Sequence, residues 1–169
     1  MKIMPLGATR VLLLSVGVLA LVAGSARAAD QLTDSHARDI VAPFYDALNT
    51  APGNDVPDLV VKVTSPDWLS CSGNDTCRPR DKVIGAIVGL HDAIPDLKWE
   101  IKELRVAGNQ VIVRGEATGT PGGEFLGVPY GGKSFKVMSI DVHTIEGDKL
   151  VRSYHVEDWM GATRQLSTK

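Results

Sequence analysis

Two pairs of segments with alternating apolar and polar residues constrain the fold of this chain most. These segments cover residues 97–107, 110–120, 134–145 and 149–157. The first pair flanks Gly108-Asn109, and the second pair flanks Gly147-Asp148. Alternation over this length is typical of strands with one buried face, and glycine beside asparagine or aspartate is typical of hairpin turns. The second half of the chain is therefore predicted to form two long β-hairpins.

Helical periodicity precedes these strands. The segment 35–50 carries apolar residues at helical spacing, although Pro43 should bend this helix or delay its start. Further elements are expected as a short helix or turn at 56–64, a strand at 67–72, a helix within 78–96 and a final short helix at 160–166. Helices followed by long strands predict the α+β class, with a curved antiparallel sheet wrapped around the N-terminal helices. A sheet curved in this way forms a cone with an internal pocket, which is the default ligand site.

The N-terminus has the pattern of an export signal. Lys2 and Arg10 precede the apolar run VLLLSVGVLALVAG, and Ala26 and Ala28 have the small-residue spacing of a cleavage site. The run is shorter than the roughly 20 residues that a membrane-spanning anchor, the alternative, requires. Residues 1–28 are thus predicted to be a signal peptide, and the protein is expected to be periplasmic or secreted.

Removal of this segment would leave residues 29–169 as one domain. It would take three of the 18 basic residues and leave 15 against 20 acidic residues, a net charge of −5. A nucleic acid partner is not expected at this charge, and neither is a membrane after cleavage.

The two cysteines, Cys71 and Cys77, bracket the segment SGNDT. In an oxidising compartment such a pair is expected to form a disulfide, with a free thiol pair or a weak metal site as the alternatives. A zinc site requires four ligands, and no second pair of cysteines or histidines lies near Cys71 at metal spacing. We therefore expect a disulfide and no metal.

Three stretches resemble the SnoaL-like polyketide cyclases, also called ester cyclases, of the nuclear transport factor two-like superfamily. They are GTPGGEFLGVPYGGK, IDVHTIEGDKLV and HVEDWMGATRQL. The resemblance extends from Ala37 to about Leu166, and its most specific part is GEFLGVP at residues 123–129. It implies an α+β cone, commonly dimeric, that closes a ring by intramolecular aldol condensation without cofactor or metal.

The resemblance also implies an acid/base pair in the pocket. The cyclases of this family use an aspartate near the end of the last strand as acid/base, assisted by a histidine on the preceding strand. In this sequence the matching positions are His155 and Asp141, so the two residue types are exchanged.

Strand geometry decides whether Asp141 and His155 can meet. Opposed residues of an antiparallel pair share a face, and a three-residue loop at residues 147–149 would set these two side by side. A two-residue turn at Gly147-Asp148 would instead place them on opposite faces. The residues leave both loops open, whereas the family resemblance favours the longer one.

If the two side chains share the pocket, the imidazole could take a proton next to a carbonyl while Asp141 fixes its tautomer. His143 is expected at the pocket rim, and Trp159 is expected to plug one end of the cone. Hydroxyl groups that could donate to an enolate oxygen are those of Tyr45, Tyr130, Ser139 and Ser153.

Two functions remain open from the sequence. One is an exported, cofactor-free enzyme that uses Asp141 and His155 for cyclase- or isomerase-type chemistry on a small hydrophobic or carbonyl-containing molecule. The other is a binding module that holds such a molecule without turnover. A homodimer is expected with either, because Met138, Ile140 and Val142 make the outward sheet face too apolar to stay in water.

Overall fold

The computed structural model describes residues 32–168, so the predicted signal peptide at 1–28 lies outside the described residues. The four helices are α1 (Asp34–Leu48), α2 (Val56–Val63), α3 (Arg80–Ala93) and α4 (Trp159–Ser167). The six strands are β1 (Thr64–Cys71), β2 (Cys77–Pro79), β3 (Lys98–Ala107), β4 (Gln110–Gly119), β5 (Phe135–Glu146) and β6 (Lys149–Glu157). No helix of residues 32–168 has the length and apolar character needed to cross a membrane.

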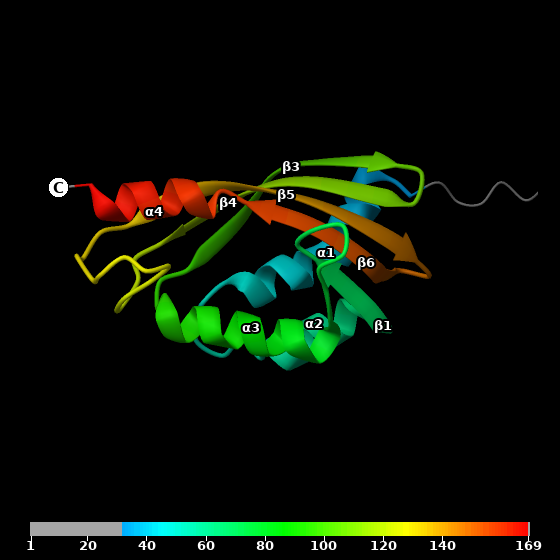
Figure 1. Cartoon of the computed structure of the whole chain (residues 1–169). Coiled ribbons are helices and arrows are strands. Elements are labelled where there is room, and N and C mark those ends of the chain that lie inside the picture. Colours follow the sequence, from blue (N-terminus) through cyan, green and yellow to red (C-terminus); the bar gives the residue numbers. More distant parts are fainter. Residues whose placement is uncertain (1–31, 169) are drawn as a thin grey trace, which may run out of the picture.

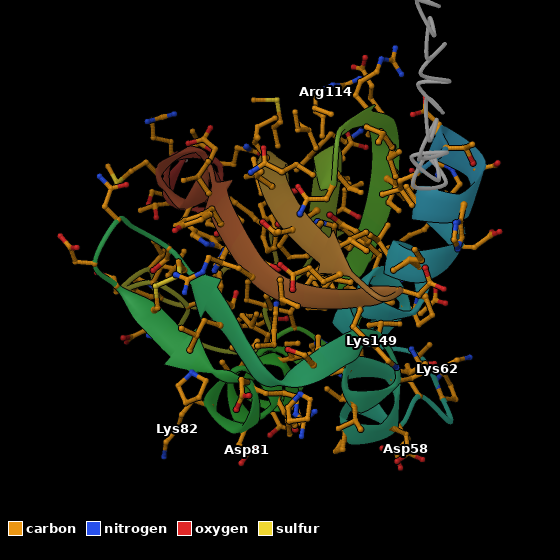
Figure 2. All side chains as sticks on the ribbon, turned by 90° about the vertical axis from the view of Figure 1, so that its right-hand side faces the viewer. Asp58, Lys62, Asp81, Lys82, Arg114 and Lys149 are labelled. Atoms are coloured by element: carbon orange, nitrogen blue, oxygen red, sulfur yellow. A yellow bond between two sulfur atoms is a disulfide. The ribbon has the colours of Figure 1, made fainter. Side chains whose placement is uncertain are left out.

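The strands and helices form an α+β arrangement, which confirms the predicted fold class. Figure 1 shows the long strands as one curved layer. Helices α2 and α3 lie below this layer, and α4 lies at its left-hand end, near the C-terminus. The core is built from the inner faces of the sheet and the apolar sides of these helices. In Figure 2, Asp81 and Lys82 on α3 point away from the sheet, and Arg114 points outward from the sheet.

The sheet is open and mixed, in the order β2-β1-β6-β5-β4-β3. Both predicted hairpins are present, as β3–β4 and β5–β6. The expectation of a wholly antiparallel sheet was wrong for one pair, because β1 runs parallel to β6. Turn residues report only on strands that follow each other in the chain, and β1 and β6 are far apart in sequence.

Helix α1 runs without interruption through Pro43. Thr33 caps its start by accepting a hydrogen bond from the backbone N–H of His36. Its apolar face, which includes Phe44 and Tyr45, packs into the core. The buried face compensates for the backbone hydrogen bond that proline removes, so the late start considered from the sequence does not occur.

The β5–β6 hairpin combines a two-residue turn with a β-bulge. Glu146 pairs with Lys149 across Gly147 and Asp148, which have φ angles of 54° and 59°. Positive φ at both central residues is the requirement of a type I′ turn. The register then shifts between Thr144 and Ile145, so that one extra residue of β6 is accommodated.

This bulge changes which residues share a face. Beyond it, Asp141 lies directly opposite His155, as the resemblance implied. The turn has two residues, however, rather than the three that were expected for this pairing. A two-residue turn does not separate the two side chains when a bulge follows it.

Candidate active site

A cavity of about 520 Å³ lies between the concave face of the sheet and the helices. Its polar lining residues come from β1 and the residue that follows it, and from β2, β5 and β6. Its apolar lining residues come from α1, α3, α4, β3 and the loop before β5. The polar lining residues are Ser70, Ser72, Arg78, Asp141, His143, Ser153, His155 and Glu157. The apolar lining residues are Phe44, Leu48, Val83, Ala86, Ile87, Leu90, Trp99, Phe125, Leu126 and Trp159.

Helix α3 contributes one wall of this cavity. Only Ile87 of the helix is buried in the core, whereas Val83 and Leu90 are half-buried and face the cavity. Val88 of the same helix is 41% exposed. Helix α3 is thus only weakly buried, although it is apolar, because part of its apolar face borders the cavity.

The GEFLGVP stretch lies at the same cavity. Phe125 and Leu126 line it, and Leu126 adopts a φ of 52° in the loop before β5. The ring of Phe125 stacks on Phe135 and meets Trp159 edge to face. Trp159 therefore lines this end of the cavity, together with a loop that the sequence did not place there.

Asp141 is the buried acid of the cavity, with 5% of its surface exposed. Burial raises its pKa to about 7, and the nearby charge of Glu157 adds to the rise, while His155 and Ser139 partly oppose it. The Ser139 hydroxyl donates to Asp141 Oδ2 at 3.3 Å and accepts from Trp99 Nε1 at 3.2 Å. Asp141 can therefore exchange a proton near neutral pH.

His155 is bound to Glu157 rather than to Asp141. Its Nδ1 lies 2.7 Å from Glu157 Oε1, while Glu157 Oε2 accepts from Trp159 Nε1 at 3.2 Å. The hydrogen bond to Glu157 raises the pKa of His155, burial lowers it, and the charges of Glu157 and Asp141 raise it further. The expectation that Asp141 fixes the tautomer of His155 was wrong, because Glu157 occupies that position.

Glu157 was not identified from the sequence, although a pattern pointed to it. Residues two apart on a strand share a face, so an inward His155 requires an inward Glu157. A histidine and a glutamate in that spacing can form an ion pair without any contribution from another strand. Glu157 therefore belongs to the candidate site.

A buried chain of hydrogen bonds supports Asp141 from behind. Trp68 Nε1 donates to Ser153 Oγ at 3.0 Å, Ser153 Oγ lies 2.7 Å from His143 Nδ1, and His143 Nε2 lies 3.1 Å from the Tyr45 hydroxyl. Both ring nitrogens of His143 thus have hydroxyl partners, Ser153 at Nδ1 and Tyr45 at Nε2, and the tautomer of His143 decides which partner donates.

His143 is completely buried and stays neutral in this chain. Burial lowers its pKa to about 3, and the charge of His155 lowers it further. The predicted rim position was therefore wrong. Burial also raises the pKa of Tyr45 well above 10, with Asp141 and Glu157 contributing, so its hydroxyl remains a donor.

The four hydroxyl groups expected to face a substrate are distributed differently. Ser153 lines the cavity, but its hydroxyl is engaged by Trp68 and His143. Tyr45 and Ser139 lie behind the cavity wall and contact His143 and Asp141. Tyr130 is 63% exposed and lies outside the cavity, on a separate shallow depression. Of the four hydroxyls, that of Ser139 contacts Asp141 directly.

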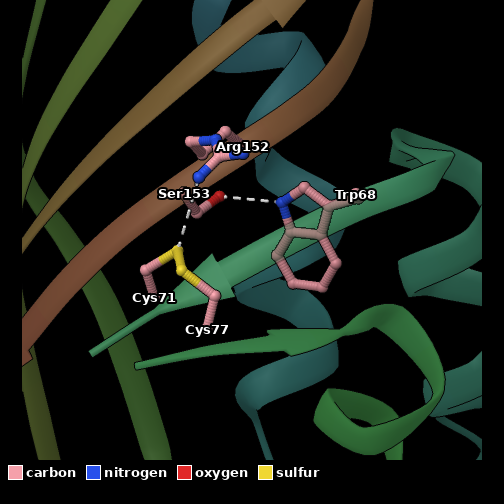
Figure 3. Close-up of a disulfide and its surroundings, with 5 residues drawn as sticks. All are labelled: Trp68, Cys71, Cys77, Arg152 and Ser153. Carbon is pink, nitrogen blue, oxygen red and sulfur yellow. Dashed lines mark hydrogen bonds between the residues drawn. A yellow bond between two sulfur atoms is a disulfide. The ribbon is translucent and has the colours of Figure 1, made fainter. Parts of the chain in front are cut away.

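The predicted disulfide joins Cys71 at the end of β1 to Cys77 at the start of β2 (Figure 3). Cys71 is fully buried, and Arg152 Nη1 lies 4.0 Å from its Sγ. The disulfide closes the loop that leads into β2, a strand of three residues that the sequence did not predict. A strand this short shows no periodicity, so only the cysteine pairing indicated order there.

The arrangement provides three elements for proton transfer at carbon: a buried acid with a pKa near neutrality, an imidazole held by a carboxylate, and a mainly apolar lining on the helix side of the cavity. The Nε2 atom of His155 makes no hydrogen bond with residues 32–168 and can therefore meet a ligand oxygen.

The fold of this chain is similar to that of several solved structures. IdmH of Streptomyces antibioticus is 22% identical, with a TM-score of 0.67 over 77% of this chain and 97% of that protein. TsrD of Streptomyces laurentii is 23% identical, with a TM-score of 0.69 over 81% and 98%. A SnoaL-like polyketide cyclase of Agrobacterium tumefaciens is 21% identical, with a TM-score of 0.63 over 77% and 97%. At these identities the structural likeness shows the fold.

Among proteins of curated function, none matches this sequence significantly. The family model described as SnoaL-like polyketide cyclase matches residues 39–166, which is most of the chain. With the fold and the family model in agreement, the chain belongs to the SnoaL-like polyketide cyclase family.

Proposed function

We propose that this protein is an exported enzyme that moves a proton at a carbon next to a carbonyl group, in a cyclase- or isomerase-type reaction of a small apolar molecule. The family supports a reaction of this type. The observation that carries the proposal is the position of Asp141, buried in an apolar cavity with a pKa near 7 and opposite His155. The site needs no metal or cofactor for the steps below.

Asp141 is the better proton acceptor of the two residues. Because Glu157 raises the pKa of His155, that imidazole tends to carry a positive charge and has no lone pair to offer. The pKa of Asp141 near 7 leaves part of it ionised at neutral pH, in a site where its basicity is greater than in water. The roles differ from those expected from sequence, in which the imidazole took the proton.

The proposed reaction follows from these charges. Asp141 takes a proton from the carbon next to a carbonyl, and the N–H of the His155 imidazolium stabilises the enolate oxygen. In a ring closure, the enolate carbon then forms a bond with a second carbonyl carbon of the same molecule. The resulting alkoxide takes the proton back from Asp141, which restores the carboxylate.

The test is proton exchange in heavy water, followed by NMR on a panel of small ketones and β-keto esters. Asp141→Asn should lower the exchange rate by roughly 100-fold or more, because the amide cannot accept the proton. Asp148→Asn, in the exposed hairpin turn, is the matched control and should keep the rate. Equal exchange by the wild type and Asp141→Asn would contradict the proposal.

A binding module without turnover is the second candidate. It is favoured by the engagement of the cavity's polar groups with one another, as in the contacts of Ser153 with His143 and of Glu157 with His155. For such a module, neither protein would catalyse exchange, and Asp141→Asn would change only the affinity of a bound ketone.

Export is proposed from the apolar N-terminal run and the Ala26 to Ala28 spacing. The disulfide between Cys71 and Cys77 is compatible with an oxidising compartment. Mass spectrometry of the protein recovered from the cell exterior or periplasm should give a chain that begins at Ala29.

A further inference from the structure

The cavity carries one permanent cation that the proposed reaction does not use. Arg78 is the single arginine or lysine among the described residues that line it. Arg105, Arg114 and Arg164 are paired with acids, whereas Arg78 has no carboxylate of residues 32–168 within 4.0 Å. A guanidinium placed at a cavity without a protein partner can bind an anionic group of a ligand.

The sheet register directs Arg78 toward the cavity. Arg78 lies opposite Ser70 on β1, and Ser70 lies opposite Ser153 on β6. Residues in one row across a sheet share a face, and all three line the cavity. The charge of Arg78 is also sensed by His155, whose pKa is raised chiefly by the hydrogen bond to Glu157 and is lowered in part by Arg78.

The backbone around Arg78 is restrained on both sides. Cys77, the preceding residue, is tied to Cys71 by the disulfide, and Pro79, the following residue, pairs with Leu69. Strand β2 has only these three residues, so without the disulfide few contacts would hold it at the sheet edge. The disulfide therefore positions the arginine at the cavity.

The two charged regions of the cavity lie far enough apart to hold two ends of one ligand. Strands β2 and β5 are separated by β1 and β6, which is three strand spacings or about 14 Å between backbones. Asp141 lies on β5, whereas Glu157 lies on β6, two strand spacings or about 10 Å from β2. Ser70 and Ser153 lie between Arg78 and Asp141 on the sheet face, and the apolar lining comes mainly from the helices opposite. A ligand anion at Arg78 is thus kept away from the two carboxylates.

We propose that Arg78 binds the carboxylate of an apolar substrate and thereby sets which end of that substrate reaches Asp141. A singly charged carboxylate matches one guanidinium, whereas a phosphate would bring a second negative charge into a cavity that already holds two acids. The inference rests on the proposed function for the role of Asp141. Its test measures binding alone, so either idea can fail without the other.

The experiment uses calorimetric titration of the full mature chain at pH 8 with decanoate, methyl decanoate and decyl phosphate, each below its micelle concentration. The wild type should bind decanoate at least about tenfold more tightly than the ester, as expected for a charge-assisted hydrogen bond. Arg78→Gln should reduce this ratio to about threefold or less, and Arg78→Lys should give an intermediate ratio.

Arg114→Gln is the matched control, because Arg114 lies outside the cavity and is paired with Glu103, so it should leave the ratio unchanged (Figure 2). Circular dichroism melting checks that Arg78→Gln remains folded. The proposal is overturned if Arg78→Gln keeps the wild-type ratio, if the wild type does not prefer decanoate, or if none of the three molecules binds. Tighter binding of decyl phosphate than of decanoate would overturn the carboxylate assignment.

Discussion

At the residue scale, the two cavity histidines show how position decides chemistry. His143 is fully buried among hydroxyl groups, and burial lowers its pKa to about 3. His155 is partly exposed, and the hydrogen bond to Glu157 raises its pKa. Burial therefore keeps the His143 imidazole neutral in its hydrogen-bond chain, whereas Glu157 favours the protonated form of the His155 imidazole. Such opposite shifts are how a single site obtains an acid and a base.

The pKa of Asp141 has a consequence for stability. Its folded value of about 7 exceeds the ordinary 3.8, so the folded protein binds more protons than the unfolded chain between these values. Stability from this group is therefore present at low pH and is lost as pH rises from about 4 to about 7, by up to about 4 kcal/mol. Asp141→Asn should match the wild type near pH 4 and be more stable at pH 8.

Urea unfolding of both proteins at pH 4 and pH 8 measures this difference. Asp75→Asn is the control, because Asp75 is exposed in the loop between the two cysteines and makes no ion pair with residues 32–168, so the stability difference should be the same at both pH values. A wild type that is no less stable than Asp141→Asn at pH 8 would show that the Asp141 charge is not disfavoured by burial.

At the element scale, the β5–β6 hairpin shows what the sequence could and could not predict. The turn at Gly147-Asp148 and the pairing of Asp141 with His155 were both indicated, yet they were judged incompatible. The bulge reconciles them by adding one residue to β6. A bulge of this kind leaves no residue signature in β6, because its position is set by packing on the two faces of the sheet rather than by local preference.

The site residues on β5 and β6 could be predicted from the sequence, because strand alternation fixes which face of the sheet each residue occupies. Alternation along β5 and β6 placed Asp141, Ser153 and His155 inward and also implied Glu157. The contributions of Arg78 and of Phe125 required the tertiary structure, because one lies on a three-residue strand and the other in a glycine-rich loop. Neither segment is long enough to show a periodicity that would orient its side chains.

At the scale of the whole molecule, the α+β class followed from helices first and hairpins afterwards, whereas the parallel placement of β1 beside β6 did not. The outer face of the sheet is apolar as the sequence suggested. Its exposed large apolar residues are Ile112 at 38%, Met138 at 53%, Tyr154 at 40% and Val156 at 61%. A patch of this kind on one sheet face is typical of an interaction surface.

We propose that this face joins two copies of the chain. Size-exclusion chromatography with light scattering should give twice the mass of one chain, and Val156→Lys should shift the protein toward the monomer, because it places a charge at the centre of the interface. Val88→Lys, on the exposed side of α3, is the control and should leave the dimer intact. A monomeric wild type at micromolar concentration would rule out the dimer.

Carboxyl ¹³C NMR of labelled protein against pH measures whether Asp141 exchanges its proton near neutral pH inside the cavity. We expect one aspartate carboxyl resonance with a midpoint near pH 7, which is absent in Asp141→Asn. If the Asp141 resonance instead titrates near pH 4, the carboxylate is too weak a base for the proposed proton transfer.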